Sequence, residues 1–247
     1  ETDAYFAAFT IPDFLNHLLA GGSLSITFIP SFARYLAEGK EEEGFRSFST
    51  IATVMGLGML FFIVLGEFLA GRVIPLIAPG FSPAQAALAA RLTRIVLPAQ
   101  IFFYIGGLLM AVQYARKQFF LPALAPLIYN AGIIGGGLPL GRDRGREGFA
   151  WGVLAGAFLG NFALQIYGAR RGGLSFSPRL DFSDPGLKEF IRLSIPILLW
   201  SPIGRDVLGF DAEPPFGLRE DVFTLILSLP VIFYSCSIFF TGAVRAL

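Results

Sequence analysis

Long apolar stretches alternate with short charged segments along almost the whole chain. The longest of these stretches contain few fixed charges and cover residues 51–78, 95–115, 119–141 and 149–169. A single helix needs about 20 mostly apolar residues to cross the hydrocarbon core of a bilayer. The pattern therefore predicts an all-α fold, a polytopic transmembrane helical bundle.

Proline, glycine and charged clusters divide the chain into helices. The predicted helices cover about 3–34, 47–77, 83–115, 119–140 and 149–169, and a sixth begins near Leu187. The charged segments 37–46 and 141–148 are predicted to be solvated loops, and Ser82 is a predicted N-cap. Pro12, Pro98 and Pro126 fall inside predicted helices, where each is either a candidate hinge of a transporter or a fixed kink.

The composition agrees with a membrane protein and adds a prediction about packing. Charged residues make up 15% of the chain, whereas a soluble domain carries about 25%. The 29 glycines matter because small residues let membrane helices approach one another closely. Gly152, Gly156 and Gly160 recur at every fourth position and predict such a close-packing face, and the glycine run at 135–137 is interpreted in the same way.

Charge and reactive side chains exclude several classes of function. The net charge of +1 leaves no footprint for a nucleic-acid partner. With Cys236 as the single cysteine and His17 as the single histidine, an internal disulfide and a cysteine-based or multi-histidine metal site are excluded. Because the chain has no phosphate-binding loop and no nucleophile motif, the sequence predicts neither an enzyme nor a cofactor.

Basic residues are shared unevenly between the two sets of loops. The loops after the first, third and fifth predicted helices hold Arg34, Lys40, Arg46, Arg116, Lys117, Arg170, Arg171, Arg179 and Lys188. The loops of the opposite set hold mainly Arg72, Arg142, Arg144 and Arg146. Since loops rich in Lys and Arg stay in the cytoplasm, the first set is predicted to be cytoplasmic.

Five polar residues in or beside the apolar helices form the candidate site. Asp13, Asn16 and His17 stand at positions i, i+3 and i+4 and therefore share one helical face. Asp3 stands at a predicted membrane boundary, and Asn130 lies within an apolar helix. Polar groups inside membrane helices are costly and usually face a cavity or a partner. We expect these residues to line a substrate cavity; the alternative is that they bind neighbouring helices and serve packing.

Several longer strings of residues resemble a known family. The string TDAYFAAFTIPDFLNHLLAGGSLSITFIPSFARY (2–35) resembles the second transmembrane helix of the lipid II flippases. These form the MurJ/MviN family of the multidrug/oligosaccharidyl-lipid/polysaccharide exporter superfamily. The similarity continues through APGF (78–81), LPALAPLIYNAGII (121–134) and SPRLDFSDPGLKEFIRLSIPI (177–197), so that it covers about residues 2–199.

The resemblance implies a fold and a function. Members have two six-helix lobes around a cavity that opens to one side of the bacterial cytoplasmic (inner) membrane at a time. They flip lipid II, the undecaprenyl-pyrophosphate-linked peptidoglycan precursor, for cell wall synthesis. This chain would be the amino-terminal lobe, and its partners would be lipid II, membrane lipids and the second lobe of the same protein. Asp3 matches an acidic residue of the family, and Asn16 takes the place of a cavity arginine.

The resemblance also divides the chain into segments. Residues 1–199 match family helices two to six and the start of helix seven, and the family's first helix, which carries essential arginines, is missing. Residues 200–221 form an atypical charged segment rich in proline and glycine, interpreted as the mark of a truncation or an assembly artefact. Residues 222–247 are a candidate extra membrane helix whose authenticity the sequence leaves open.

Other functions stay open at this point. Another exporter of the superfamily would move an oligosaccharide-linked lipid or a drug, and a truncated fragment would have no transport activity of its own. A membrane-embedded enzyme acting on lipid-linked sugars would need paired carboxylates at the interface. Asp181 and Asp184 form the close pair in the predicted cytoplasmic connector, and their setting is typical of turns. The sequence favours the flippase hypothesis.

Overall fold

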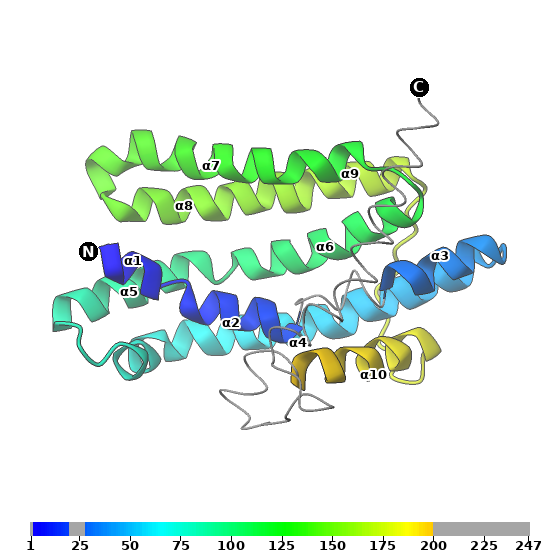
Figure 1. The fold of residues 1–247 in the computed structure, drawn as a ribbon, viewed down its shortest axis with the longest axis horizontal. Helices are drawn as coiled ribbons and strands as arrows, with labels where there is room; N and C mark the ends of the chain where they lie inside the picture. Colours follow the sequence, from blue (N-terminus) through cyan, green and yellow to red (C-terminus); the bar gives the residue numbers. More distant parts are fainter. Residues whose placement is uncertain (1, 20–27, 200–247) are drawn as a thin grey trace, which may run out of the picture.

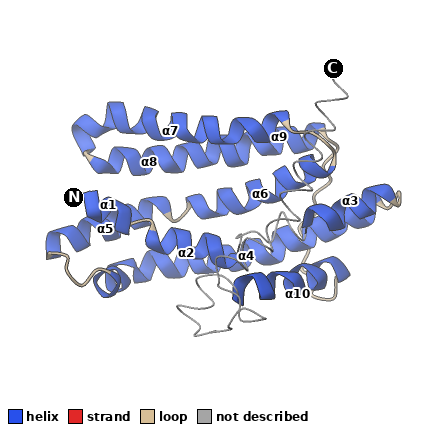
Figure 2. Ribbon diagram, in the orientation of Figure 1, coloured by secondary structure: helices blue, strands red, loops and turns tan. Residues whose placement is uncertain are grey.

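The computed structural model describes residues 2–19 and 28–199, and the regular elements of that part of the chain are all helices (Figures 1 and 2). Four spans are long and apolar enough to cross a membrane. They are α4 (Glu41–Ile77), α5 (Pro83–Val96) with α6 (Ala99–Ala115), α7 (Phe120–Arg144), and α8 (Arg146–Gly156) with the π-helical η2 (Ala157–Ala163) and α9 (Leu164–Arg171). The predicted all-α, polytopic bundle is confirmed.

Shorter helices flank these spans. α1 (Thr2–Ala7), α2 (Thr10–Leu19) and α3 (Ile29–Ala37) precede them, and α10 (Pro185–Leu199) follows an irregular connector over residues 172–184. α2 packs against both α4 and α6, while α3 and α10 pack against α4. The predicted segments 200–221 and 222–247 lie outside the described residues.

Two predicted loops are wrong in length. The turn before α4 consists of residues 38–40, so residues 41–46 are helical. The three glutamates of that first turn stabilise the helix because negative charge complements the positive end of its dipole. The segment 141–148 likewise continues its flanking helices and leaves Gly145 as the single turn residue. Its φ of 56° lies in the left-handed region that glycine adopts without strain.

The predicted N-cap at Ser82 is confirmed, and two of the three prolines lie at helix breaks. Ser82 is the N-cap of α5: its Oγ accepts from the Gln85 N–H at 3.3 Å, and Gln85 Oε1 accepts from the Ser82 N–H at 2.9 Å, which is a capping box. Pro12 follows the break between α1 and α2, and Pro98 separates α5 from α6. Pro126 lies inside the uninterrupted α7.

The predicted glycine face joins α7 to α8. An ideal Cβ on Gly136 would lie 2.5 Å from Gly152 Cα, and one on Gly156 would lie 2.5 Å from the Tyr129 carbonyl oxygen. The two backbones therefore touch, and the predicted close packing at 152, 156 and 160 is confirmed. Within the 135–137 run the outcome is mixed, because a Cβ on Gly135 would meet no atom within 4 Å.

Two buried glutamines join α6 to α9. Gln113 Nε2 donates to Gln165 Oε1 at 3.0 Å, and both residues are fully enclosed. Gln165 Nε2 donates to the carbonyl oxygens of Gly160 at 3.0 Å and Leu121 at 3.3 Å, which brings η2 and α7 into the same network. The network satisfies polar groups that would otherwise be stranded in an apolar interior.

Replacement of Gln165 by leucine should therefore destabilise the bundle. The variant loses the three hydrogen bonds of its side chain and leaves Gln113 Nε2 with only backbone carbonyl acceptors, so we expect a loss of about 2 kcal/mol in the free energy of unfolding. Unfolding in lipid bicelles measures it. The double variant Gln113→Leu/Gln165→Leu should recover part of that loss because no amide is then left unpaired. A double variant that loses the sum of both single effects would contradict this account.

α10 is fastened to α4 by a buried carboxylate. Asp184 is 4% exposed, and its two oxygens accept from Ser47 Oγ at 3.0 and 3.2 Å. Asp184 Oδ1 also accepts from the Leu187 N–H at 2.9 Å and so caps the start of α10. An ideal Cβ on Gly186 would lie 2.6 Å from Ser47 Oγ, so only glycine lets the two helices come this close.

The three basic loops lie at one end of the bundle. The turns after α3 and α6 and the connector after α9 all meet there, whereas the α7–α8 turn and α1 lie at the opposite end (Figure 1). An ion pair between Arg116 and Glu41 links two of these loops, and the Ser177 N–H donates to Ser49 Oγ at 3.1 Å to attach the third. The loops that the sequence assigns to one side of the membrane are thus on one side of the molecule; we name it the basic end.

Candidate functional site

The candidate site is built on a break between α1 and α2. Proline has no N–H, so Pro12 cannot bond the carbonyl of Ala8, four residues earlier, and the helix is interrupted at Ala8 and Phe9. Thr93 of α5 supplies the missing donor, since its hydroxyl lies 3.1 Å from the Ala8 carbonyl oxygen and 2.9 Å from that of Ala89. The neighbouring helix thus satisfies the broken backbone, as membrane interiors require.

Small residues hold α1 and the start of α2 tightly against α5. Ala4 packs with Ala70, Ala89 and Ala90, and each of these is buried. Close packing on this side leaves the adjoining side of α1, which bears Asp3, exposed. At the same end Arg146 Nη2 of α8 donates to Thr2 Oγ1 at 2.9 Å. The position of Asp3 at one end of the molecule is therefore fixed by contacts to α5 and α8.

α2 has two faces of opposite character. Asp13 and Asn16 are exposed and one turn apart, as predicted, and Asp13 lies within electrostatic range of Tyr129 on α7. The other face of α2 borders an apolar groove of about 420 Å³ against α4, lined among others by Ile11, Phe14 and Phe62. One short helix thus presents polar groups on one side and an apolar groove on the other.

The remaining predicted site residues are less closely associated. His17 lies on α2, but its side chain is outside the described residues. Asn130 is exposed on α7 directly after Tyr129, and among the described residues no hydrogen bond or ion pair connects it to α2. The structure therefore groups Asp13 with Asn16 on α2, and places Asp3 and Asn130 on separate helices.

Sequence reasoning missed Tyr129 and Tyr5. The Tyr129 ring meets Phe103 edge-on at 5.3 Å, and Tyr5 meets Phe9 at 5.1 Å and Phe149 at 6.5 Å. Both tyrosines pack beside a buried cluster that joins α1, α5 and α8. A tyrosine within an apolar helix gives no distinct sequence signal, because its ring suits lipid and protein equally. The ring contacts made by Tyr129 and Tyr5 became visible only in the structure.

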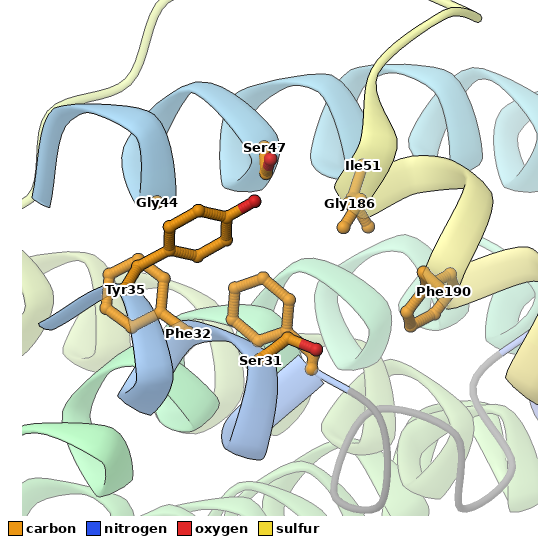
Figure 3. A pocket seen from close by; sticks show the side chains of 9 residues that line it. Ser31, Phe32, Tyr35, Gly44, Ser47, Ile51, Gly186 and Phe190 are labelled. Carbon is orange, nitrogen blue, oxygen red and sulfur yellow. The ribbon is translucent and has the colours of Figure 1, made fainter. Parts of the chain in front are cut away.

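A second, much smaller cavity lies where α3, α4 and α10 meet. Figure 3 shows Phe32 and Tyr35 from α3, Gly44 and Ser47 from α4, and Phe190 from α10 around it. The cavity has about 10 Å³ of accessible space, which is room for one water molecule. It is too small for a substrate and belongs to the packing that holds α10. Of the two carboxylates of the connector, Asp184 caps α10 and Asp181 accepts from the Ser183 N–H at 2.9 Å in a turn.

The fold and the amphiphilic α2 define a multi-pass membrane protein, a helical bundle with a candidate site at a broken helix. A family model described as lipid II flippase MurJ matches residues 1–203. The chain belongs to this MurJ lipid II flippase family, which confirms the resemblance stated from the sequence.

Individual relatives agree with the family match. The lipid II flippase MurJ of Burkholderia cenocepacia is 30% identical over 207 residues, which are 79% of this chain and 39% of the relative. Probable lipid II flippases MurJ of Synechocystis sp. and Thermotoga maritima are each 30% identical, over 80% and 77% of this chain and 39% and 37% of the relatives. The chain therefore spans about two fifths of the length of these curated relatives.

Proposed function

We propose that this chain is part of a flippase that moves lipid II across the bacterial cytoplasmic membrane by alternating access, for cell wall synthesis. Family membership supports the activity, which is transport rather than catalysis. The observation that carries the proposal is α2, whose polar face bears Asp13 and Asn16 while its other face borders an apolar groove. Such a helix suits a substrate with a charged headgroup and an apolar tail.

The physical task of the site is to lower the cost of moving a pyrophosphate through hydrocarbon. Transfer of a bare charge into an apolar medium costs tens of kcal/mol, so the headgroup must stay among polar groups. In this proposal Asp3, Asp13, Asn16, His17 and Asn130 line the polar cavity, the second lobe of the same protein closes it, and the lipid tail stays in the membrane. Pro12 and Pro98, at helix breaks, and Pro126, within α7, are the proposed bending points.

The proposal is tested in the full-length protein that carries this chain. We expect Asp13→Ala to lower the rate of lipid II flipping by about tenfold, because it removes a charge-assisted hydrogen-bonding group from the proposed cavity. Complementation of a flippase-depleted bacterium and the amount of lipid II on the outer leaflet are the measurements. Glu43→Ala, which removes an exposed carboxylate outside the proposed cavity, is the matched control and should flip at the wild-type rate.

The same assay separates the alternatives. If the full-length protein moves oligosaccharide-linked lipids or drugs and does not move lipid II, the chain is part of an exporter with a different substrate. If Asp13→Ala and Glu43→Ala flip equally well, the α2 face is not the substrate site. The chain of residues 1–247 expressed alone should fail to complement, because the proposed cavity needs the second lobe.

A further inference from the structure

A polar pocket opens at the basic end of the bundle, away from α1 and α2. It has a volume of about 240 Å³ and lies between the first turns of α4 and the connector 172–184. Its lining consists of two arginines, three serines, a glutamate and a phenylalanine: Arg46, Arg179, Ser49, Ser175, Ser177, Glu42 and Phe45. None of these residues belongs to the proposed substrate cavity.

The connector is held on α4 although it has no regular secondary structure. The Ser177 N–H donates to Ser49 Oγ at 3.1 Å, and the Arg179 N–H donates to Thr53 Oγ1 at 3.2 Å. The Phe176 ring meets Phe48 edge-on at 6.2 Å. These contacts hold the connector, and with it Arg179, at the pocket that Arg46 of α4 also lines.

In the described part of the chain, the side-chain donors of this pocket have no protein acceptor. Among the described residues, no carboxylate lies within ion-pair distance of Arg46 or Arg179, whereas Arg34 binds Glu189 at 3.0 Å nearby. Ser49 is 2% exposed, and its Oγ accepts a hydrogen bond from the Ser177 N–H. No described group accepts a hydrogen bond from the Ser49 hydroxyl. Two guanidinium groups and adjacent hydroxyls form the donor set that a phosphate oxygen cluster requires.

The depth of the pocket matches the headgroup region of a membrane. α4 has 37 residues, a length of about 55 Å, whereas the hydrocarbon core is about 30 Å thick. Its uncharged run begins at residue 47, so Arg46 stands at the boundary. The connector also exposes Phe176, Leu180 and Phe182, each more than half accessible, beside the charged lining. Apolar side chains next to cationic groups are typical of a surface in contact with lipid.

We propose that this pocket binds the phosphate of a membrane phospholipid. Arg46 and Arg179 bind the phosphate oxygens, Ser49 and Ser177 donate to them, and Glu42 accepts from a terminal hydroxyl or ammonium of the headgroup. The exposed apolar side chains of the connector lie against the acyl chains. The proposal needs the chain to lie in a membrane and does not depend on which lipid the protein transports.

The test measures retained phospholipid on the purified full-length protein. Native mass spectrometry with added phosphatidylglycerol should show a bound lipid whose affinity falls about tenfold in Arg46→Gln/Arg179→Gln. Arg170→Gln removes an exposed arginine at the same end of the bundle but outside the pocket, and should change the affinity less than about twofold. An equal loss in both variants would overturn the proposal, because it would show only a general effect of charge.

A second arm separates a lipid from free phosphate. Inorganic phosphate and glycerol 3-phosphate should fail to displace the lipid at millimolar concentration, since they lack acyl chains; displacement by either would show that the pocket binds soluble phosphate and overturn the lipid assignment. Thermal unfolding of each variant reports on folding. If the double variant unfolds, the two single arginine variants are measured in the same way, and unchanged lipid affinity in both would overturn the proposal.

Discussion

Gly152→Val is expected to separate α8 from α7 and to lower the free energy of unfolding by about 3 kcal/mol, the upper end of the usual range for overpacked sites. A Cβ at this position would lie 2.6 Å from the Gly132 carbonyl oxygen and 3.0 Å from both Cα and the carbonyl oxygen of Ile133. These are backbone atoms, which cannot rotate away as a side chain does. The helices must therefore move apart and lose contact along their length.

The contact with α8 contributes an unusually large share of the packing that attaches α7 to the bundle. Only 17% of the apolar window of α7 is buried, against 44–56% for the other three spans. α7 therefore depends on its glycine face for attachment. In lipid no hydrophobic force holds two helices together, so loss of close packing has no compensation.

The matched control for Gly152→Val is Gly135→Val. Gly135 lies on the facing helix α7, and a Cβ there meets no atom within 4 Å, so valine points into open space. Both variants make the same glycine-to-valine change in helix propensity, so unfolding in bicelles should show a difference of more than about 2 kcal/mol between them that reports the packing at Gly152. Equal stability of the two variants would show that close packing at Gly152 does not hold α7.

The features predicted from sequence are those set by local spacing. Glycines four residues apart share one side of any helix, so the face at 152, 156 and 160 was predictable without its partner. The Ser82–Gln85 capping box joins residues three apart. The sequence predicted Ser82 as the N-cap but did not single out Gln85. The four longest apolar stretches correspond to the four spans of the described residues, whereas the predicted helix 3–34 is wrong: it breaks at Ala8 and Phe9, and residues 20–27 lie outside the described part of the chain.

The features that sequence reasoning missed depend on contacts between distant residues or on helix ends. Charged residues in 37–46 and 141–148 suggested loops, but water satisfies charged side chains on a helix that extends beyond the membrane. The bond from Thr93 to Ala8 joins residues 85 apart, so Pro12 could be seen as a break but its compensation could not. For the same reason Asp13 was predicted as a site residue while Tyr129, on a helix more than 100 residues further along the chain, was not.

Asp184 makes both a local contact, at the start of α10, and a contact with a residue far away in the sequence. Its role at the start of α10 follows from the sequence Asp-Pro-Gly, a turn followed by a proline that suits the first helical position. Its partner Ser47 lies 137 residues away and could come only from the structure. The carboxylate therefore holds the connector, the first turn of α10 and the first turns of α4 in one place.

Asp184→Ala is expected to release α10 from α4 and to lower the free energy of its local opening by about 3 kcal/mol. The estimate adds a charge-assisted hydrogen bond of about 2 kcal/mol from Ser47 to a helix cap of about 1 kcal/mol. Hydrogen exchange measures it directly, because the amides of α10 should exchange about a hundredfold faster in the variant while those of α6 keep their protection.

Two controls distinguish the role of the buried carboxylate from a loss of turn structure. Asp181→Ala removes the turn bond to Ser183, which lies at the exposed side of the connector, and should change exchange in α10 only slightly. Ser47→Ala removes the contact with α4 but keeps the cap on Leu187, so its effect should be intermediate. If Asp181→Ala and Asp184→Ala expose α10 equally, the connector as a whole holds the helix. If the order is as expected, a single buried carboxylate sets how readily α10 moves relative to α4, and any rearrangement that carries α10 away from the bundle must first break its bond to Ser47.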